Sequence, residues 1–258
     1  MTARIVLVSG ASSGIGEATA RRYGANGAHV LLLARNSDRL DEAARAIRKD
    51  GGTATPYSLD LADPRAIADV SARIARETGT PDILINNAGA GRWLPILETS
   101  AEEALAMIEV PYLAAFNLTR AFLPAMLARR TGSIACVTSP ASFIAWPNAA
   151  AYIAARRALA GFTDALRTDV KGSGLSVTLV VLGMVESPYW EHNPGSRKYA
   201  PTVKAITPED AAEAIFTGVE ARKRTVVKPG FFRALFLLNA VAPRLVASQV
   251  RRSVPKRE

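Results

Sequence analysis

Short apolar runs alternate with longer stretches of helical pattern, and this order restricts the fold more than any other feature of the chain. Seven runs are almost continuously apolar, at residues 4–9, 29–34, 54–59, 82–86, 133–139, 175–182 and 225–228. Helical patterns fall between them at 15–25, 38–50, 64–78, 101–129, 149–171 and 208–221. Continuous apolar runs are typical of strands covered on both faces. We therefore expect a single α/β domain with a doubly wound parallel sheet of about seven strands.

The composition and charge of the chain exclude several classes of protein. Of its 258 residues, 49% are hydrophobic and 21% charged, which is the balance of a globular protein and not of a disordered one. The formal net charge is +9, but the basic residues are scattered apart from a cluster near the C-terminus, and no nucleic-acid-binding motif is found. The first residues show no basic leader with a cleavage site. We therefore expect a cytoplasmic protein that binds no nucleic acid.

Cysteine and histidine are too few for disulfide or metal chemistry. Cys136 is the single cysteine, and His29 and His192 lie far apart in the sequence, so no metal-ligand spacing exists. Because Cys136 falls within the apolar run 133–139, we interpret it as a core residue and not as a nucleophile. No metal site is expected.

The first junction between a strand and a helix carries the segment SGASSGIG at residues 9–16. Parallel sheets of this type bind ligands at the carboxyl ends of their strands. The three glycines allow a tight turn and a close approach to a pyrophosphate, whose charge a helix N-terminus stabilises. A plain strand-to-helix turn is the alternative. The candidate cofactor-binding residues here are Gly10, Ser12, Ser13, Gly14, Ile15 and Gly16.

The next two junctions indicate which dinucleotide is bound. Arg35 follows the second strand, where an acidic residue accepts from a ribose 2′-hydroxyl and an arginine pairs with a 2′-phosphate. We therefore expect NADP(H) in preference to NAD(H), the alternative being a solvated loop arginine. After the third strand, Asp60 is placed to accept from the adenine amino group and Leu61 to pack on the ring, although Asp60 also fits a helix cap.

Two further segments complete the set of motifs. LINNAGAG, at residues 84–91, ends the fourth strand with small residues and with two asparagines whose amides can tie adjacent strands together. Ser139 ends the fifth strand, thirteen residues before Tyr152. Tyr152 and Arg156 lie four apart in a helical pattern, so both side chains project from the same face.

With this set of motifs, the chain resembles the short-chain dehydrogenase/reductase family from Ile5 to about Lys228. The resemblance implies a Rossmann-like fold, an NAD(P)-dependent oxidoreductase, and a homodimer or homotetramer. It also implies that Tyr152 exchanges a proton with the substrate oxygen as general acid/base, and that Ser139 orients that oxygen. The further cofactor-binding candidates are Asn87, Ala88, Gly89, Gly183 and Val185.

Two catalytic positions depart from the family pattern. The family carries a lysine four residues after the tyrosine, where its charge favours the phenolate and its side chain holds the nicotinamide ribose; here the residue is Arg156. A guanidinium keeps the charge but cannot relay a proton, and a surface arginine is the alternative. Where the family has an asparagine, the chain has Pro111, which leaves the carbonyl of Met107 without its helical partner. We expect a kink there, with the freed carbonyl as a group that holds water.

The last third of the chain is interpreted as a substrate lid and a C-terminal extension. We assign residues 1–230 to the dinucleotide-binding domain, including a lid at 187–205, and residues 231–258 to an apolar and basic extension. Tyr189, Trp190 and Tyr199 give the lid an apolar character, and a disordered surface loop is the alternative. The extension is too interrupted for a transmembrane span. It fits a helix packed on the pocket or a subunit interface, a peripheral membrane anchor, or a loosely ordered tail.

These features favour an NADP(H)-dependent oxidoreductase that interconverts an alcohol and a carbonyl on a fairly apolar small molecule. Ser139, Tyr152 and Arg156 are its candidate catalytic residues, and Tyr152 and Arg156 are also candidate cofactor contacts. Pro111 and Arg156 support an alternative, an NADP(H)-binding protein of the same fold whose hydride transfer is lost or replaced by a non-redox step.

Overall fold

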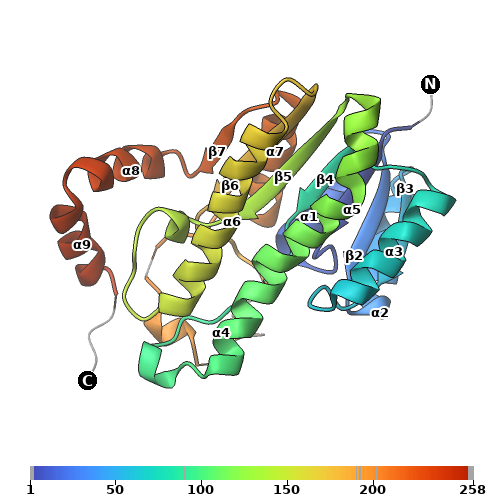
Figure 1. Cartoon of the computed structure of the whole chain (residues 1–258). Helices are drawn as coiled ribbons and strands as arrows, with labels where there is room; N and C mark the ends of the chain where they lie inside the picture. Colours follow the sequence, from blue (N-terminus) through green and yellow to red (C-terminus); the bar gives the residue numbers. More distant parts are fainter. Residues whose placement is uncertain are drawn as a thin grey trace.

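A parallel sheet of seven strands forms the centre of the protein (Figure 1). The computed structural model describes residues 3–89, 91–189, 191, 193, 195–201 and 203–254. The strands are all parallel and lie in the order β3-β2-β1-β4-β5-β6-β7. Their bounds are β1 Ile5–Ser9, β2 His29–Ala34, β3 Thr53–Ser58, β4 Ile83–Asn86, β5 Gly132–Thr138, β6 Leu175–Leu182 and β7 Thr225–Lys228. The order reverses between β1 and β4, which is where sheets of this type bind ligands.

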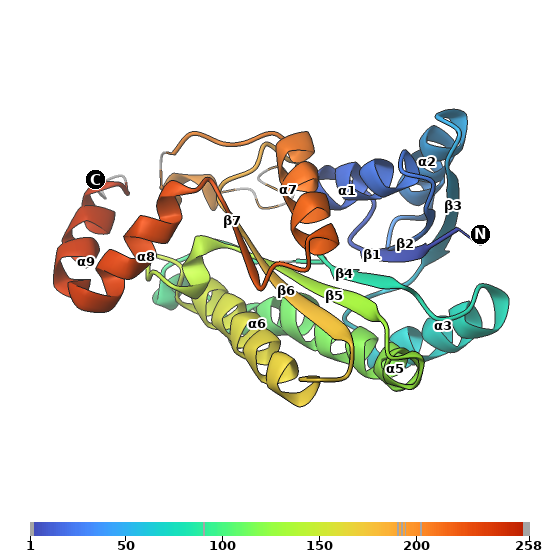
Figure 2. The same ribbon diagram turned by 90° about the horizontal axis from the view of Figure 1, so that it is seen from above.

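Helices cover both faces of the sheet (Figure 2). On one face lie α1 (Gly14–Gly24), α2 (Ser37–Lys49) and α7 (Pro208–Glu220), and on the other α3 (Pro64–Glu77), α5 (Ala114–Arg129) and α6 (Ala150–Asp169). Successive strand side chains alternate between two apolar clusters: Val6 and Val8 belong to the cluster with α1, whereas Leu7 belongs to the cluster with α5. Burial on both sides explains the continuous apolar runs, and the predicted fold class is confirmed.

The predicted helix at 101–129 is not one continuous α-helix. It consists of α4 (Ala101–Ile108), a π-helical turn at Glu109–Leu113, and α5. Pro111 lies within the π-helical turn, since proline has no N–H to donate and its ring crowds the preceding turn of an α-helix. The α-helix is therefore interrupted at Pro111, while the predicted kink and the role of the Met107 carbonyl stay predictions. Short 3₁₀ turns occur at Ile96–Glu98, Pro140–Ser142 and Arg197–Tyr199.

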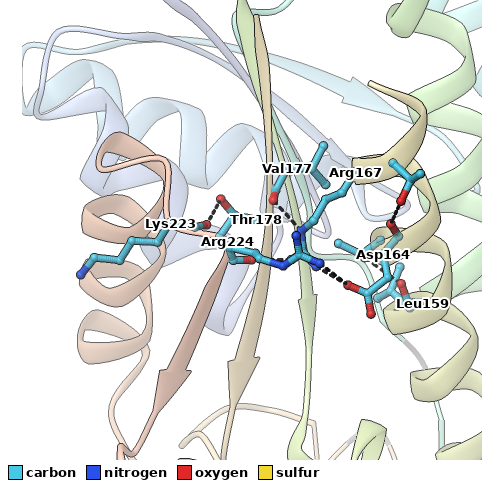
Figure 3. A network of polar contacts seen from close by, with 9 residues as sticks. Leu159, Asp164, Arg167, Val177, Thr178, Lys223 and Arg224 are labelled. Carbon is cyan, nitrogen blue, oxygen red and sulfur yellow. Dashed lines mark hydrogen bonds and ion pairs between the residues drawn. The ribbon is translucent and has the colours of Figure 1, made fainter. Parts of the chain in front are cut away.

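A network of polar contacts around Arg167 holds α6 against the sheet (Figure 3). The Nε of Arg167 donates to the carbonyl of Val177 in β6 at 3.0 Å. Its two terminal nitrogens donate to the carboxylate of Asp164 and to the carbonyl of Arg224, just before β7. The side chain of Arg167 is only 9% exposed, and its bond to Val177 is partly buried, whereas the bonds to Asp164 and Arg224 lie at the surface. They fix α6, whose first turns carry the candidate catalytic residues, relative to β6 and β7.

Two helices follow β7 at the edge of the sheet, α8 (Phe231–Val241) and α9 (Pro243–Arg252) (Figures 1 and 2). Val246 and Val250 of α9 are buried against Ile144, in the loop after β5. From α8, the Nδ2 of Asn239 donates to the carbonyl of Phe143 at 3.1 Å. Both helices therefore pack on the body of the protein. Among the helices that the structure describes, none is long and apolar enough to cross a membrane.

Candidate active site

A large cavity opens at the carboxyl ends of the strands, with a volume of about 1060 Å³. Its walls come from the loops that follow β1 to β6, the π-helical turn, the first turns of α6, and the helices α8 and α9. Every catalytic and cofactor-binding candidate named from the sequence lines this cavity. Residues from all along the chain thus converge on one concave site, as in enzymes of this architecture.

The turn after β1 brings the first and fourth strands into close contact. A Cβ on Gly16 would lie 2.0 Å from the carbonyl oxygen of Gly10 and 2.6 Å from the Nδ2 of Asn87, so only glycine fits there. The amide of Asn87 donates to the carbonyl of Ser9 at 3.1 Å. In return, the Oγ of Ser9 accepts from the backbone N–H groups of Asn87 and Ala88, each at 3.0 Å. An asparagine amide thus ties β1 to β4, as expected.

The first turn of α1 presents backbone donors to the cavity. Ser13 precedes the helix, but its side chain makes no capping hydrogen bond within the described part of the chain. Gly14, with φ of 53°, brings the backbone close to the loop after β6, because a Cβ there would lie 3.0 Å from the Cβ of Ser187. The turn therefore offers its N–H groups and the positive end of the helix dipole to an anion.

The loops after β2 and β3 contribute charged residues to the cavity wall. Arg35 and Asp60 are exposed and line it, while Leu61 is buried beside them. Asp60 accepts from the backbone N–H two residues later at 3.0 Å, but the cap of α3 is Asp63, so the predicted alternative of a helix cap at Asp60 is excluded. Arg39, in the first turn of α2, also lines the cavity. The sequence reasoning missed Arg39, although a second arginine four residues after the first was the available signal.

Tyr152 and Arg156 lie side by side on the first turns of α6, and each is 8% exposed. The guanidinium carbon of Arg156 lies 4.9 Å from the centroid of the Tyr152 ring. Gly89, after β4, makes room for it, since a Cβ there would lie 2.8 Å from a terminal guanidinium nitrogen. Arg156 therefore faces the cavity and not bulk water. Its Nε is buried and has no hydrogen-bond acceptor among the described residues.

Ser139 follows β5 directly and lines the cavity, and a loop connects it to the start of α6. Its Oγ accepts from the backbone N–H of Ala141 at 3.2 Å, so the hydroxyl still has a hydrogen to donate. The neighbouring Ser142 is used differently: its Oγ lies 2.7 Å from the Oγ1 of Thr138 and donates to the carbonyl of Arg156 at 2.9 Å. These buried bonds hold α6 to the end of β5 and keep Ser139 and Arg156 in one site.

Two tyrosines tie the predicted lid to the segment that follows β4. The hydroxyl of Tyr189 donates to the carbonyl of Gly91 at 2.5 Å, and the hydroxyl of Tyr199 donates to the carboxylate of Glu98 at 2.8 Å. Burial, and then the neighbouring Tyr152, raise the pKa of Tyr189 above its ordinary value, so its hydroxyl remains a donor. Trp190, the third aromatic residue of the predicted lid, lies outside the described residues.

Aromatic and aliphatic side chains form the cavity wall beyond Tyr152. The ring of Trp93 lies 5.6 Å from that of Tyr152 and 6.4 Å from that of Trp146. Phe232 and Leu235 of α8 complete this wall. Sequence reasoning did not single out the two tryptophans, because neither belongs to a motif and only the fold brings them together.

The arrangement combines an anion-binding turn, a phenol beside a fixed cation, and an apolar wall. These are the parts needed to hold a phosphorylated cofactor and to exchange a proton with an apolar substrate. In the residues that the structure describes, no group of three His, Cys, Asp or Glu side chains is placed to hold a metal ion.

The chain is similar to known oxidoreductases over most of its length. Residues 4–197 match the family described as short chain dehydrogenase. The chain is 34% identical to dehydrogenase/reductase SDR family member 7B of Rattus norvegicus, over 96% of this chain and 82% of that protein. It is 33% identical to a fatty acyl-CoA reductase of Acinetobacter baylyi, over 93% of this chain and 80% of that protein.

A solved structure shares both the fold and a good part of the sequence. It is a putative NAD(P)-dependent gluconate 5-dehydrogenase from Beutenbergia cavernae with bound NADP. It superposes with a TM-score of 0.80 at 32% identity, and the match covers 91% of this chain and 98% of that one.

Proposed function

This chain belongs to the short-chain dehydrogenase/reductase family, and from that membership we propose that it is an NADP(H)-dependent oxidoreductase that interconverts an alcohol and a carbonyl on an apolar small molecule. The observation that carries the proposal is the buried pair of Tyr152 and Arg156, which lines the same cavity as the glycine turn after β1. A phenol beside a cation can exchange protons, and the turn can hold a phosphorylated cofactor.

The residues present fit a dinucleotide. The orphaned Nε of Arg156 lies at the cavity, and an oxygen of a ribose is the kind of acceptor that a buried donor requires. When bound, NADPH supplies the hydride. The pyrophosphate is assigned to the turn between Gly10 and Gly16, and the adenine to Asp60 and Leu61. The nicotinamide half is assigned to Asn87, Ala88, Gly89, Gly183 and Val185, all of which line the cavity.

Tyr152 is the proposed general acid in the direction of reduction. It gives its phenolic proton to the substrate oxygen, and Ser139 donates a hydrogen bond to the same oxygen. The phenolate that forms lies beside the guanidinium of Arg156, whose charge favours it. Because a guanidinium does not release its proton, Arg156 stabilises the charge without relaying a proton. The phenolate then regains its proton from water that reaches the cavity.

The preference for NADP(H) rests on the arginines after β2. The cavity wall there consists of Ala34, Arg35, Asn36 and Arg39, without an acidic side chain. Two guanidinium groups suit a 2′-phosphate, with which arginine forms paired, charge-assisted bonds. We expect Arg35→Ala to lower kcat/KM for NADPH roughly tenfold and to leave that for NADH nearly unchanged. Arg45→Ala, an exposed arginine on α2 that does not line the cavity, is the control. If Arg35→Ala leaves the ratio of kcat/KM for NADPH to kcat/KM for NADH unchanged, the assignment is refuted.

The substrate is proposed to be uncharged and apolar around its carbonyl. The wall beyond Tyr152 is made of Trp93, Trp146, Phe232 and Leu235, with Val250 of α9. Burying a charge among such side chains is costly, whereas burying apolar surface is favourable by about 25 cal/mol per Å². The relative named fatty acyl-CoA reductase supports a substrate of this character.

The activity is tested by the consumption of NADPH with a panel of ketones and aldehydes of increasing chain length. We expect turnover that rises with apolar chain length, and a loss of roughly a hundredfold or more in Tyr152→Phe with NADPH binding retained. Tight NADPH binding without turnover on the whole panel would favour the alternative, a cofactor-binding protein with a non-redox role.

A homodimer or homotetramer is also proposed, by analogy with the family. Partly exposed apolar side chains on and beside α5 support it, namely Leu113, Phe116 and Leu127. Sedimentation equilibrium of the purified chain is the direct test.

A further inference from the structure

Helix α8 is apolar on two opposite faces. At 3.6 residues per turn, Phe232, Leu235 and Phe236 fall on one side, where they pack toward the cavity and the loop after β5. The opposite side, an arc of about 120°, carries large apolar side chains that remain exposed. We call this set, with one residue of α9, the outer patch: Phe231, Leu237, Leu238, Val241 and Leu245, which are 59%, 72%, 38%, 82% and 59% exposed.

Such a helix is unusual at a surface in contact with water. Surface helices present a polar outer face, and a helix that is apolar all round is normally buried. Single exposed apolar residues are common, but a row along one helix marks a surface that meets another phase or partner. We therefore expect another molecule or a lipid surface to cover the outer patch.

The charges within the α8–α9 hairpin are of one sign. Residues 231–254 contain Arg233, Arg244, Arg251 and Arg252 and no acidic residue, and all four arginines are exposed. In a symmetric contact between two copies of this patch, arginines would approach arginines, which is unfavourable. An anionic lipid surface supplies both the negative charge that these side chains attract and an apolar layer for the leucines.

We propose that the α8–α9 hairpin docks on an anionic phospholipid bilayer through the outer patch. The helix then lies in the interface, with its arginines at the headgroups and its apolar side chains among the acyl chains. Since Phe231 belongs to the outer patch and also lines the cavity, docking places the cavity mouth next to the acyl layer. An apolar molecule can then pass from the bilayer to the cavity without crossing water. Vesicle binding itself does not depend on the proposed reaction.

The test is sedimentation of the full chain with vesicles of phosphatidylcholine alone and of phosphatidylcholine mixed with phosphatidylglycerol. We expect strong binding to the anionic vesicles, weak binding to the neutral ones, and weaker binding as salt is added. The variant Leu237→Glu is expected to lower the partition coefficient at least about tenfold, and Leu237→Glu with Val241→Glu further. Both positions are exposed, so folding is checked by an unchanged melting temperature.

Matched controls separate the patch from the rest of the surface. Leu105→Glu makes the same change at an exposed leucine of α4, away from α8 (Figure 1), and should leave binding unchanged. Arg233→Gln with Arg244→Gln should weaken binding to anionic vesicles, whereas Arg45→Gln should weaken it less. The proposal is overturned if the unaltered chain does not bind anionic vesicles, or if the patch variants bind them as well as the unaltered chain does. It is also overturned if the unaltered chain binds no vesicles and forms a dimer that the patch variants convert to monomers.

Discussion

Arg156 and Gly89 form a pair whose members depend on each other. The guanidinium lies over the ring of Tyr152, and a Cβ on residue 89 would lie 2.8 Å from one of its terminal nitrogens, so the guanidinium would have to shift. Arginine is larger than lysine and planar, so a chain that uses it here needs open space beside it. The small residues after β4 thus accommodate a protein side chain, in addition to any role toward a cofactor.

Replacing the guanidinium tests what its charge contributes. A lysine keeps the charge and can relay a proton, so we expect Arg156→Lys to raise kcat about tenfold. Arg156→Met removes the charge at similar length and should lower kcat roughly a hundredfold. Steady-state kinetics, together with NADPH binding by fluorescence, distinguish turnover from affinity. Equal kcat values in all three proteins would mean that the charge takes no part in proton exchange.

Gly16 tests the close contact between β1 and β4. In Gly16→Ala the new Cβ meets the backbone of Gly10, which cannot move aside without disturbing the turn. We expect a loss of about 1–3 kcal/mol in the free energy of unfolding and weakened NADPH binding. Chemical denaturation measures the first and fluorescence titration the second.

Gly161→Ala is the matched control for this change. Gly161 lies in α6, is exposed, and its added Cβ would meet nothing within 4 Å. The same substitution should therefore stabilise the protein by about 0.5–1 kcal/mol, because alanine is the better helix former. If both variants change the free energy of unfolding by the same amount, the contact at Gly16 does not cause the change.

Among the elements, the segment after β6 and the segment after β4 close over the cavity together. In the described part of the chain, the hydroxyls of Tyr189 and Tyr199 connect the two segments, and Tyr189 is the partly buried one that lines the cavity. The π-helical turn at Glu109–Leu113 forms another part of the wall, where Glu109 and Val110 line the cavity. Interruptions of this kind in a helix are common at functional sites.

Tyr189→Phe tests whether the buried hydroxyl holds the two segments together. Its loss leaves the carbonyl of Gly91 without this donor, and we expect KM for the carbonyl substrate to rise roughly tenfold with little change in kcat. Because the pKa of Tyr189 is raised, its hydroxyl should remain a hydrogen-bond donor at the pH where a free tyrosine ionises. Tyr199→Phe, which loses an exposed contact, is the control and should have a smaller effect. A fall in kcat alone would contradict a holding role.

For the molecule as a whole, the interior is covered on both faces of the sheet, and Cys136 lies in it. Cys136 is fully buried in β5, next to α6. Burial raises the pKa of its thiol, so both access and thiolate formation are suppressed. These facts agree with its interpretation as a core residue.

The rate at which the thiol of Cys136 reacts therefore measures global unfolding of the protein. We expect a chromogenic disulfide reagent to react with the native protein at least about a thousandfold more slowly than with the chain unfolded in guanidinium, because the reaction requires unfolding. Introducing an exposed thiol by Ser248→Cys on α9 should restore a fast phase. A rapid reaction of the native unaltered protein would contradict the buried position.

The sequence was sufficient for the parts of the protein that depend on local pattern. The apolar runs predict the seven strands and their parallel direction, and the interruption of the α-helix at Pro111 follows from proline chemistry. The helical spacing of four residues is enough to place Tyr152 and Arg156 on one face of α6. Periods of two and of 3.6 residues are properties of neighbouring positions, so they can be read along the chain.

Contacts between distant segments were decided by the tertiary structure alone. The room that Gly89 leaves for Arg156, the bond from Tyr189 to Gly91, and the exposure of one apolar face of α8 have no counterpart in local spacing. They arise when crossover helices and loops dock on the sheet, and each depends on ångström-level packing between residues far apart in the chain. A linear pattern specifies which face of an element is apolar, but only packing specifies what that face meets.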